Sequence, residues 1–392
     1  MSAILEKYRP VFARIASGAL ERELSRTLPH EQLRWLAETG FGAVRVPVGR
    51  GGDGASPSEL IGLLIELAAA DPHAAQALRG HFAFVEDRLG AEQSESRDQW
   101  LARFARGELV GNAVTEIGSV ALGSTGTTVT PTDTGWALTG RKFYTTGSIF
   151  ADWIDASAVT PDGIEVAALV SRHQPGVLIS DDWDGFGQRL TGSGTTVFES
   201  AHVEHGDVYD FTTRFPAQTA FYQLVLVAVL AGITSAVERD VVAELRDRAR
   251  AYSHGSADES RHDPQLLEAV GRISAAADAT AAIARQAAMT LDAVESALPG
   301  EVGDRKREAE LASASAQVVV SELAIRAASN LFDVLGASAT STAKALDRHW
   351  RNARTVASHN PVAFKARILG DAAVNGTEPP YEWYVGRSST RS

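Results

Sequence analysis

Two segments near the middle of the chain bring aromatic rings, hydroxyls and glycines together. They read GRKFYTTGS at residues 140–148 and DDWDGFGQRLTGSGT at residues 181–195, and they contain Tyr144, Thr146, Trp183, Thr191 and Ser193. Aromatic rings can stack on a flat heterocycle, and hydroxyls with glycine N–H groups can hold a phosphate or the edge of a ring. These residues are therefore candidates for a cofactor site. The alternative is a core aromatic beside a turn, and for Trp183 the two interpretations are balanced.

Three other residues could position or move a proton. His81 lies in the segment LRGHFAF, His359 lies at a helix break before Pro361, and Asn112 lies in GNAVTEIG. Histidine titrates near neutral pH and can donate or accept a proton, and an asparagine amide can bond a ring carbonyl or nitrogen. For all three residues the structural alternative, a side chain satisfied by its own surroundings, stays open.

Arginine and histidine clusters suggest an anion site more readily than a metal site. The segment LDRHWRNAR places Arg348, Arg351 and Arg354 at intervals of three, near one stripe of a helix. Clustered arginines favour an anion or a carboxylate partner, and a structural ion pair is the commoner outcome. His202 and His205 lie close together, but no carboxylates with ligand spacing surround them, so the sequence predicts no metal site.

The composition excludes several classes of protein. The 392 residues carry a net charge of −12, whereas a nucleic-acid binder usually shows a basic face. The absence of cysteine excludes disulfides and thiolate chemistry. Charges recur through the N-terminal segment, which argues against a signal peptide, and the longest apolar run, residues 224–233, is too short to span a membrane. A cytoplasmic protein that binds neither nucleic acid nor membrane is the simplest expectation.

The pattern of the chain changes twice. Residues 1–108 show helical spacing of apolar side chains, residues 109–212 change to alternating strands and turns, and residues 213–392 return to long helices. In the last part, helices are expected over 216–251, 264–298, 301–335, 347–358 and 361–374. Alanine-rich helices joined by short turns favour an antiparallel bundle. The expected fold is therefore mainly α with a β insert, in three domains with these boundaries.

Five segments together resemble the acyl-CoA dehydrogenase superfamily over essentially the whole chain. They read ALRGHFAFVED, GNAVTEIG, LTGRKFYTTGS, DDWDGFGQRLTGSGT and LDRHWRNARTVASHN. More closely, they are similar to its flavin-dependent monooxygenase branch, which includes dibenzothiophene monooxygenases and sulfur-acquisition oxidoreductases. The resemblance implies an N-terminal helical domain, a central β-barrel-like domain and a C-terminal four-helix bundle, assembled as a homotetramer.

The fifth segment distinguishes the two activities of this superfamily. In many acyl-CoA dehydrogenases an Arg-Asp-Ala-Arg-like stretch is followed by Tyr-Glu-Gly-Thr, whose glutamate removes the α-proton of the thioester. Here Arg351-Asn-Ala-Arg354 is followed by Thr355-Val-Ala-Ser-His-Asn360, and His359 stands about where the carboxylate would be. Because some dehydrogenases take their base from another helix, an FAD-dependent acyl-CoA dehydrogenase stays the alternative.

The monooxygenase branch implies a two-component reaction. A flavin reductase supplies reduced FMN, O₂ adds at flavin C4a to give a peroxide or hydroperoxide, and one oxygen atom passes to the substrate. The flavin carries the organic chemistry, while the protein supplies a dry pocket and a few hydrogen bonds. The expected substrate is a small, fairly apolar organic molecule, with sulfur compounds as first candidates, and FAD is the second candidate for the cofactor.

The resemblance also implies roles for individual residues. The residues expected at the flavin are Tyr144 and Trp183 flanking its ring, Thr146 and Asn112 near its reactive edge, Ser193 with Thr191 at its polar tail, and Arg250 and Arg351 at its phosphate. His359 would stabilise or protonate the peroxide, and His81 would line the substrate side.

The sequence differs from the flavin-dependent monooxygenase branch at positions that affect these residue roles. The loop LGASAT at residues 335–340 lacks the arginine that dibenzothiophene monooxygenase has after Gly-Ala, and Val356 replaces the second histidine of its C-terminal pair. Phosphate contacts and proton handling are therefore expected to differ. A third hypothesis, a degenerate family member that serves as a scaffold, predicts no flavin binding in any redox state. The retention of Trp183, Ser193 and His359 argues against it.

Overall fold

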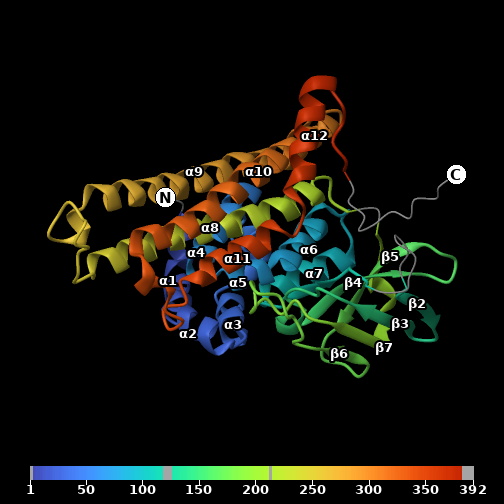
Figure 1. Cartoon of the computed structure of the whole chain (residues 1–392). Helices are drawn as coiled ribbons and strands as arrows, with labels where there is room; N and C mark the ends of the chain where they lie inside the picture. Colours follow the sequence, from blue (N-terminus) through green and yellow to red (C-terminus); the bar gives the residue numbers. More distant parts are fainter. Residues whose placement is uncertain (1–2, 118–125, 212–213, 382–392) are drawn as a thin grey trace, which may run out of the picture.

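The structure consists of two helical segments with a β segment at one side of them (Figure 1). It is a computed structural model that describes residues 3–117, 126–211 and 214–381. Gly118, the last residue of the GNAVTEIG segment, lies outside the described residues. In Figure 1 the helices from both parts of the chain form one body, and the strands lie at its lower right.

The N-terminal helices begin where local capping rules place them. They are α1 (Ala3–Ser17), α2 (Ala19–Ser25), α3 (His30–Glu38), α4 (Pro57–Ala70), α5 (Pro72–Ala77), α6 (Arg79–Gly90) and α7 (Glu95–Ala105). At α4, Ser56 and Glu59 form a capping box, in which each side chain accepts from the backbone N–H of the other. Asp71 accepts from the first N–H groups of α5 and also pairs with Arg22 of α2 at 2.8 Å. These contacts fix the start of α6, which carries His81.

The β segment is a mixed sheet of short strands. They are β1 (Val110–Ala113), β2 (Thr128–Thr132), β3 (Gly135–Lys142), β4 (Trp153–Val159), β5 (Glu165–Ser171), β6 (Val177–Ile179), β7 (Thr196–Val203) and β8 (Val208–Asp210). The order is β6-β7-β3-β2-β4-β5-β8, and β1 pairs in parallel with β4. Inward-facing Leu138, Ile154 and Phe198 belong to its separate apolar core.

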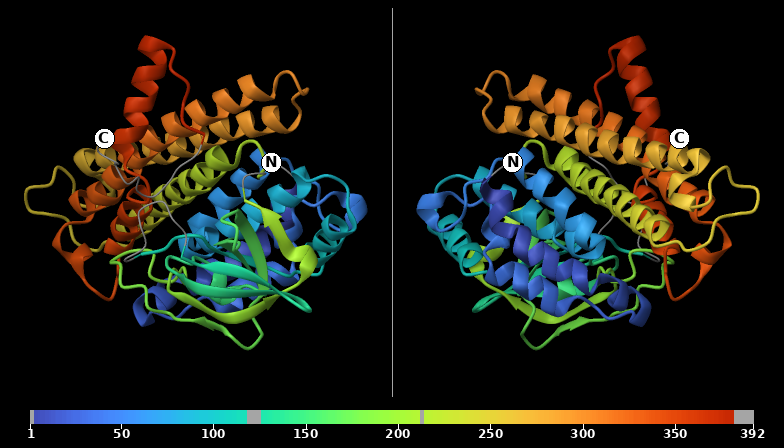
Figure 2. Two further views of the ribbon diagram at one scale, coloured as in Figure 1. Left: turned by 90° about the vertical axis from the view of Figure 1, so that its right-hand side faces the viewer. Right: turned by 90° about the vertical axis from the view of Figure 1, so that its left-hand side faces the viewer.

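The C-terminal helices are α8 (Gln218–Arg246), α9 (Pro264–Glu295), α10 (Val302–Leu335), α11 (Asp347–Ala357) and α12 (Val362–Asn375). By length and composition α8 could cross a membrane, but 89% of its most apolar stretch is buried inside the protein. Such burial is typical of a core helix. Both views of Figure 2 show α12 projecting from the end of the bundle.

One hydrophobic core joins the N-terminal and C-terminal helices. Phe41 and Leu64 belong to the same buried cluster as Leu224 of α8 and Leu331 of α10. A Cβ added at Gly232 of α8 would lie 2.6 Å from the Ile65 carbonyl oxygen, so α8 and α4 are in close contact. The helices that carry candidate site residues are therefore fixed relative to one another. The division at 108 and 212 follows the type of element, and as a division into domains it stays a prediction.

Candidate active site

A chain of hydroxyl groups connects the two predicted cofactor segments. Thr146 Oγ1 lies 2.7 Å from Ser193 Oγ, Ser193 Oγ lies 2.7 Å from Thr191 Oγ1, and Thr191 Oγ1 donates to the Gln188 carbonyl at 2.9 Å. Each hydroxyl has a single proton to donate. Because Thr191 donates to the carbonyl, Ser193 must donate to Thr191 and Thr146 to Ser193. Thr146, at the more exposed end of the chain, keeps free acceptor capacity and can receive an N–H from a ligand.

Tyr144 and Trp183 lie together beside this hydroxyl chain. Their ring centroids are 5.9 Å apart and the ring planes meet at 82°. Tyr144 is 48% exposed, so its ring is open to a ligand. A flat molecule can stack face to face on only one of two perpendicular rings and must meet the other with its edge. The predicted flanking of a flavin by Tyr144 and Trp183 would therefore use the face of one ring and the edge of the other.

Backbone strain marks the same place. Tyr144 (φ 56°), Gln188 (φ 49°) and Arg26 (φ 53°) all adopt the left-handed conformation. Arg26 ends α2 in the left-handed conformation common at helix C-termini, and its guanidinium donates to the Trp183 carbonyl at 3.2 Å. Each such residue costs free energy and persists only where its surroundings impose it, a condition that recurs at ligand sites.

The loop that carries Trp183 is held in a defined conformation. Asp182 accepts from the N–H and the hydroxyl of Thr195, both at 2.7 Å, and the Trp183 indole N–H donates to the Gly187 carbonyl at 3.1 Å. A Cβ on Gly187 would lie 2.1 Å from the Arg351 carbonyl oxygen. The loop therefore lies directly against α11, which only a glycine at this position permits.

Arg351 joins this region, but as part of its scaffold. Its guanidinium donates to Glu23 at 2.9 Å, to Asp347 at 2.7 Å and to the Phe186 carbonyl at 3.0 Å. These carboxylates raise the pKa of Arg351 against the opposing effect of burial. Because its donors are engaged, Arg351 is better placed to tie α2, α11 and the Trp183 loop together than to bind the predicted phosphate. Arg348 is likewise paired with a carboxylate of α8.

Asn112 presents its amide beside the first turn of α6. Its backbone carbonyl accepts from the Ser148 hydroxyl at 3.1 Å, which joins β1 to the turn that follows Thr146. A Cβ on Gly80 would lie 2.7 Å from the Asn112 side-chain oxygen and 2.9 Å from its Cβ. Within residues 3–117, 126–211 and 214–381 the carboxamide has no hydrogen-bond partner, so it is available to a ligand.

His81 does not reach the substrate side, contrary to the prediction. It is 1% exposed, and both ring nitrogens bond to backbone. Nδ1 accepts from the Val110 N–H at 3.2 Å, so Nε2 carries the proton and donates to the Gly42 carbonyl at 2.8 Å. Burial lowers the pKa of His81 to about 4, so the ring is neutral at pH 7. His81 is a positioning residue that holds α6 against β1. Its contact on β1 is Val110, two residues before Asn112.

His359 lies where α11 gives way to α12, and it contacts a residue that the sequence did not single out. Arg79 Nη1 lies 3.4 Å from His359 Nε2, while Arg79 Nε donates to the Tyr222 carbonyl at 3.1 Å. The Arg79 guanidinium also lies 4.4 Å above the Tyr222 ring. In the sequence, Arg79 stands directly before Gly-His at the start of the segment RGHFAFVED, and nothing there indicated its partner.

The His359 ring is reachable from solvent and yet surrounded by protein. Desolvation, followed by the charge of Arg79, lowers its pKa to about 3, so His359 is neutral at pH 7. A guanidinium has no acceptor atom, which requires Nε2 to accept and the proton to sit on Nδ1. His359 therefore offers an Nδ1–H donor.

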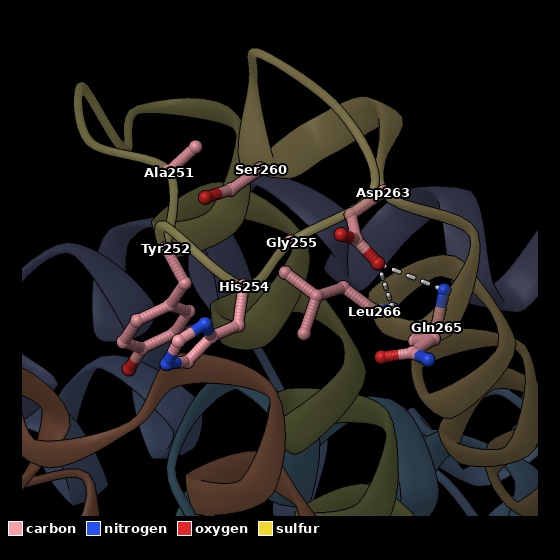
Figure 3. A pocket seen from close by; sticks show the side chains of 8 residues that line it. All are labelled: Ala251, Tyr252, His254, Gly255, Ser260, Asp263, Gln265 and Leu266. Atoms are coloured by element: carbon pink, nitrogen blue, oxygen red, sulfur yellow. Dashed lines mark hydrogen bonds between the residues drawn. The ribbon is translucent and has the colours of Figure 1, made fainter.

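Arg250 is not brought to this region within one chain. It lies between α8 and α9, and its carbonyl accepts from Ser260 at 2.9 Å. The adjacent surface hollow is lined by Ala251, Tyr252, His254, Gly255, Ser260, Asp263, Gln265 and Leu266 (Figure 3). In Figure 1 this connection lies at the end of the bundle opposite α12. None of the predicted flavin residues lines the hollow, so contact of Arg250 with a flavin would require a second copy of the chain.

The residues that do converge fit a flavin. A free acceptor at Thr146, a free amide at Asn112 and an exposed aromatic pair suit the edge and the face of a flat, nitrogen-rich ring. The Nδ1–H of His359 adds a neutral donor from the helical side. When bound, reduced FMN would supply the two electrons needed to activate O₂.

Known proteins resemble the chain in both sequence and structure. The family models for the N-terminal and C-terminal domains of acyl-CoA dehydrogenase match residues 4–108 and 224–364. A probable FMNH₂-dependent monooxygenase, SfnC of Pseudomonas putida, is 27% identical over 96% of this chain and 96% of its own.

Two solved structures extend the similarity over nearly all of the fold. The methanesulfinate monooxygenase MsuC of Pseudomonas fluorescens has a TM-score of 0.88 and 27% identity, covering 98% of this chain and 100% of its own. FMN-bound TdsC, a dibenzothiophene monooxygenase of Paenibacillus sp. A11-2, has a TM-score of 0.88 and 26% identity, covering 97% and 99%.

Proposed function

Because the chain belongs to the acyl-CoA dehydrogenase superfamily, and within it to the flavin-dependent monooxygenases, we propose that it oxygenates a small, fairly apolar sulfur compound with reduced FMN and O₂. The comparisons confirm the predicted fold, FMN as the cofactor, and monooxygenase over acyl-CoA dehydrogenase. Methanesulfinate is charged and dibenzothiophene is neutral, so the names of the relatives support a sulfur compound and leave its charge open.

The observation that carries the proposal is the state of His359. A dehydrogenase needs a carboxylate base at the thioester α-carbon, whereas His359 is a neutral imidazole whose Nε2 is occupied by Arg79. Its Nδ1–H can hydrogen-bond a polarised oxygen, and the lowered pKa of His359 disfavours the imidazolium form. Of the two roles that the sequence left open, hydrogen-bond stabilisation is therefore favoured over proton transfer.

The buried carboxylates nearest to Tyr222 are unsuited to act as a base. Asp155 accepts from Arg214 at 3.0 and 3.1 Å, and Asp87 accepts from Arg88 at 2.7 Å. Each is held as the partner of a buried guanidinium, and deprotonating a substrate would disrupt that pair. Within the described residues this supports oxygenation over removal of an α-proton.

The proposed roles of the residues in the β segment follow from their free hydrogen-bond donors and acceptors. Thr146 would accept an N–H of the reduced ring, Asn112 would bond the ring edge, and Ser193 and Thr191 would hold Thr146 in its acceptor state. Trp183 or Tyr144 would cover one face and exclude water. Exclusion of water favours transfer of oxygen to the substrate over release as H₂O₂.

A separate flavin reductase is the implied partner, since the relatives are named for FMNH₂.

A homotetramer is supported by apolar side chains on the outer helices, where Met289, Phe364 and Val374 are 57%, 48% and 82% exposed. Sedimentation at micromolar concentration tests this, and a monomer would contradict it. A cytoplasmic location is part of the proposal, in keeping with the supply of NADH that a reductase needs.

The test is a coupled assay with purified chain, FMN, NADH, a flavin reductase and isotopically labelled O₂. Methyl phenyl sulfide, methyl phenyl sulfoxide and benzenesulfinate serve as trial substrates. Label in a product, absent when the chain is omitted, is the expected result. Oxygenation of none of them, together with anaerobic bleaching of bound flavin by an acyl-CoA, would instead establish a dehydrogenase.

A further inference from the structure

Arg79 is half-buried, and it differs from four arginines that pair with carboxylates. Arg22 pairs with Asp71, Arg45 with Glu86, Arg88 with Asp87, and Arg214 with Asp155 and Asp87. For Arg79, by contrast, no salt bridge occurs among residues 3–117, 126–211 and 214–381, and its contacts are the Tyr222 carbonyl, the Tyr222 ring and His359. All of these are neutral groups.

The surroundings of the Arg79 guanidinium affect its pKa. Desolvation lowers the pKa of Arg79 to about 10, and Tyr222 alone opposes it. Carboxylates raise the pKa of Arg45 and Arg214 despite their burial. A desolvated charge without a counter-ion destabilises the fold unless a ligand supplies the opposite charge. Of the arginines in the described residues whose pKa is shifted, Arg79 is the one in which desolvation prevails.

The position of Arg79 indicates which ligand that is. The groups that suit the flavin ring come largely from the β segment, at Thr146, Ser193, Tyr144 and Trp183. Arg79, Tyr222 and His359 come from α6, α8 and the α11–α12 junction, and they are linked to that segment through Gly80, the residue after Arg79. Asn112, which adjoins Gly80, connects the two sides. The helical groups are therefore left for the substrate.

We propose that Arg79 binds an anionic group of the substrate, so that the preferred substrates are small organic acids such as sulfinates, sulfonates or carboxylates. This rests on the proposed function and specifies its substrate class. Two guanidinium donors can hold two oxygens of such a group, while the Tyr222 ring keeps the guanidinium in place. The apolar part of the substrate would then extend from Arg79 past His359 toward the flavin.

The experiment compares an acid with its neutral isostere on the full chain with FMN, reductase, NADH and O₂. The pair is (methylthio)acetate and (methylthio)acetamide, which share one thioether. In either case one oxygen atom of O₂ forms the sulfoxide, and the other leaves as water with the two electrons of reduced FMN. The wild type is expected to show a lower KM for the acid.

Three variants test whether Arg79 causes the lower KM for the acid. Arg79→Met keeps the aliphatic stem and is expected to raise the KM for the acid roughly 10- to 100-fold, the usual effect of a lost charged hydrogen bond, with little change in kcat or in the KM for the amide. Arg79→Lys keeps the charge and should recover part of the loss. Arg272→Met, which removes an exposed arginine of α9, should match the wild type.

A binding measurement separates this inference from the proposed function. Methylsulfonylacetate already carries a sulfone, so calorimetry with the FMN-bound chain measures its affinity without turnover. Weaker binding to Arg79→Met, at unchanged FMN affinity and at a melting temperature no lower than that of the wild type, supports the role of Arg79 even if no thioether is oxygenated. If the wild type bound an acid and its neutral amide with equal affinity, the proposal would be overturned. So would loss of FMN affinity in both Arg79 variants, because the anion would then be that of the flavin.

Discussion

Arg79 Nη1 and His359 Nε2 lie 3.4 Å apart and link the first turn of α6 to the junction of α11 and α12. The contact sets the protonation of the imidazole, since a guanidinium can only donate and Nε2 must then accept. The donor of His359 is consequently the Nδ1–H.

Removal of that donor should uncouple the reaction. His359→Leu is expected to lower product formation roughly 100-fold, the usual effect of losing one hydrogen bond to a developing oxyanion, while reduced FMN is still oxidised and H₂O₂ accumulates. Product formation by His359→Gln, which retains an N–H donor, should lie between that of His359→Leu and that of the wild type. The ratio of product to H₂O₂ is the measurement. Equal coupling in all three proteins would show that His359 does not act on the reacting oxygen.

The hydroxyl chain makes a prediction about the affinity for reduced FMN. Thr146→Val keeps the shape of the side chain but removes the acceptor, and a lost hydrogen bond of this kind costs about 1 kcal/mol. We expect the Kd for reduced FMN to rise about 5-fold, as followed anaerobically by flavin fluorescence. Thr130→Val, on exposed β2, is the matched control. An unchanged Kd in Thr146→Val would mean that this hydroxyl does not contact the ring.

Gly80 should be needed for the position of Asn112. In Gly80→Ala the new Cβ meets the Asn112 side chain at 2.7 to 2.9 Å, and Asn112 has to move away from the site. Oxygenation is expected to fall at least ~10-fold, because small displacements of positioned groups reduce rates strongly. Gly271→Ala in α9, where the added Cβ meets no atom within 4 Å, should retain activity and gain about 1 kcal/mol of helix stability. Full activity in Gly80→Ala would contradict the placement of Asn112.

His81 predicts a particular pH dependence of stability. Its pKa is lowered by burial to about 4, so between pH 6.5 and 4 the unfolded chain binds a proton that the native protein does not. The stability that the neutral ring contributes is thus complete above about pH 6.5 and decreases as the pH falls, by about 3 kcal/mol in total.

Urea unfolding at a series of pH values measures this contribution. The difference in free energy of unfolding between the wild type and His81→Gln should shrink between pH 7 and pH 4, because only the wild type loses it. His262→Gln, at an exposed position of the connection between α8 and α9, is the control for replacing a histidine at the surface. A constant difference for His81→Gln would mean that folding does not shift the pKa of the His81 ring.

The sequence predicted the C-terminal helices closely, because long alanine-rich stretches carry a strong periodic signal. The helix expected over 301–335 runs from Val302 to Leu335. It did not predict β4 at Trp153–Val159, whose five central residues are all buried. A strand buried on both faces lacks the alternation by which strands are recognised.

The candidate site was predicted in part for a similar reason. Thr146, Ser193 and Thr191 lie in segments of unusual composition, and the structure joins them by hydrogen bonds. Arg351 and His81 have the residue types of functional groups, but their partners, Glu23 and the Gly42 carbonyl, are remote in sequence. Arg79 was missed because what distinguishes it is the lack of a carboxylate among its neighbours in space, which no linear pattern contains.

The most direct test of the account is stopped-flow mixing of chain-bound reduced FMN with O₂, followed by flavin absorbance. We predict an oxygen adduct of the flavin that persists before oxidised FMN forms, that is shortened in His359→Leu, and that reacts faster when substrate is present. A single phase that leads directly to oxidised FMN and stoichiometric H₂O₂, with or without substrate, would contradict the central claim that this site protects and directs activated oxygen.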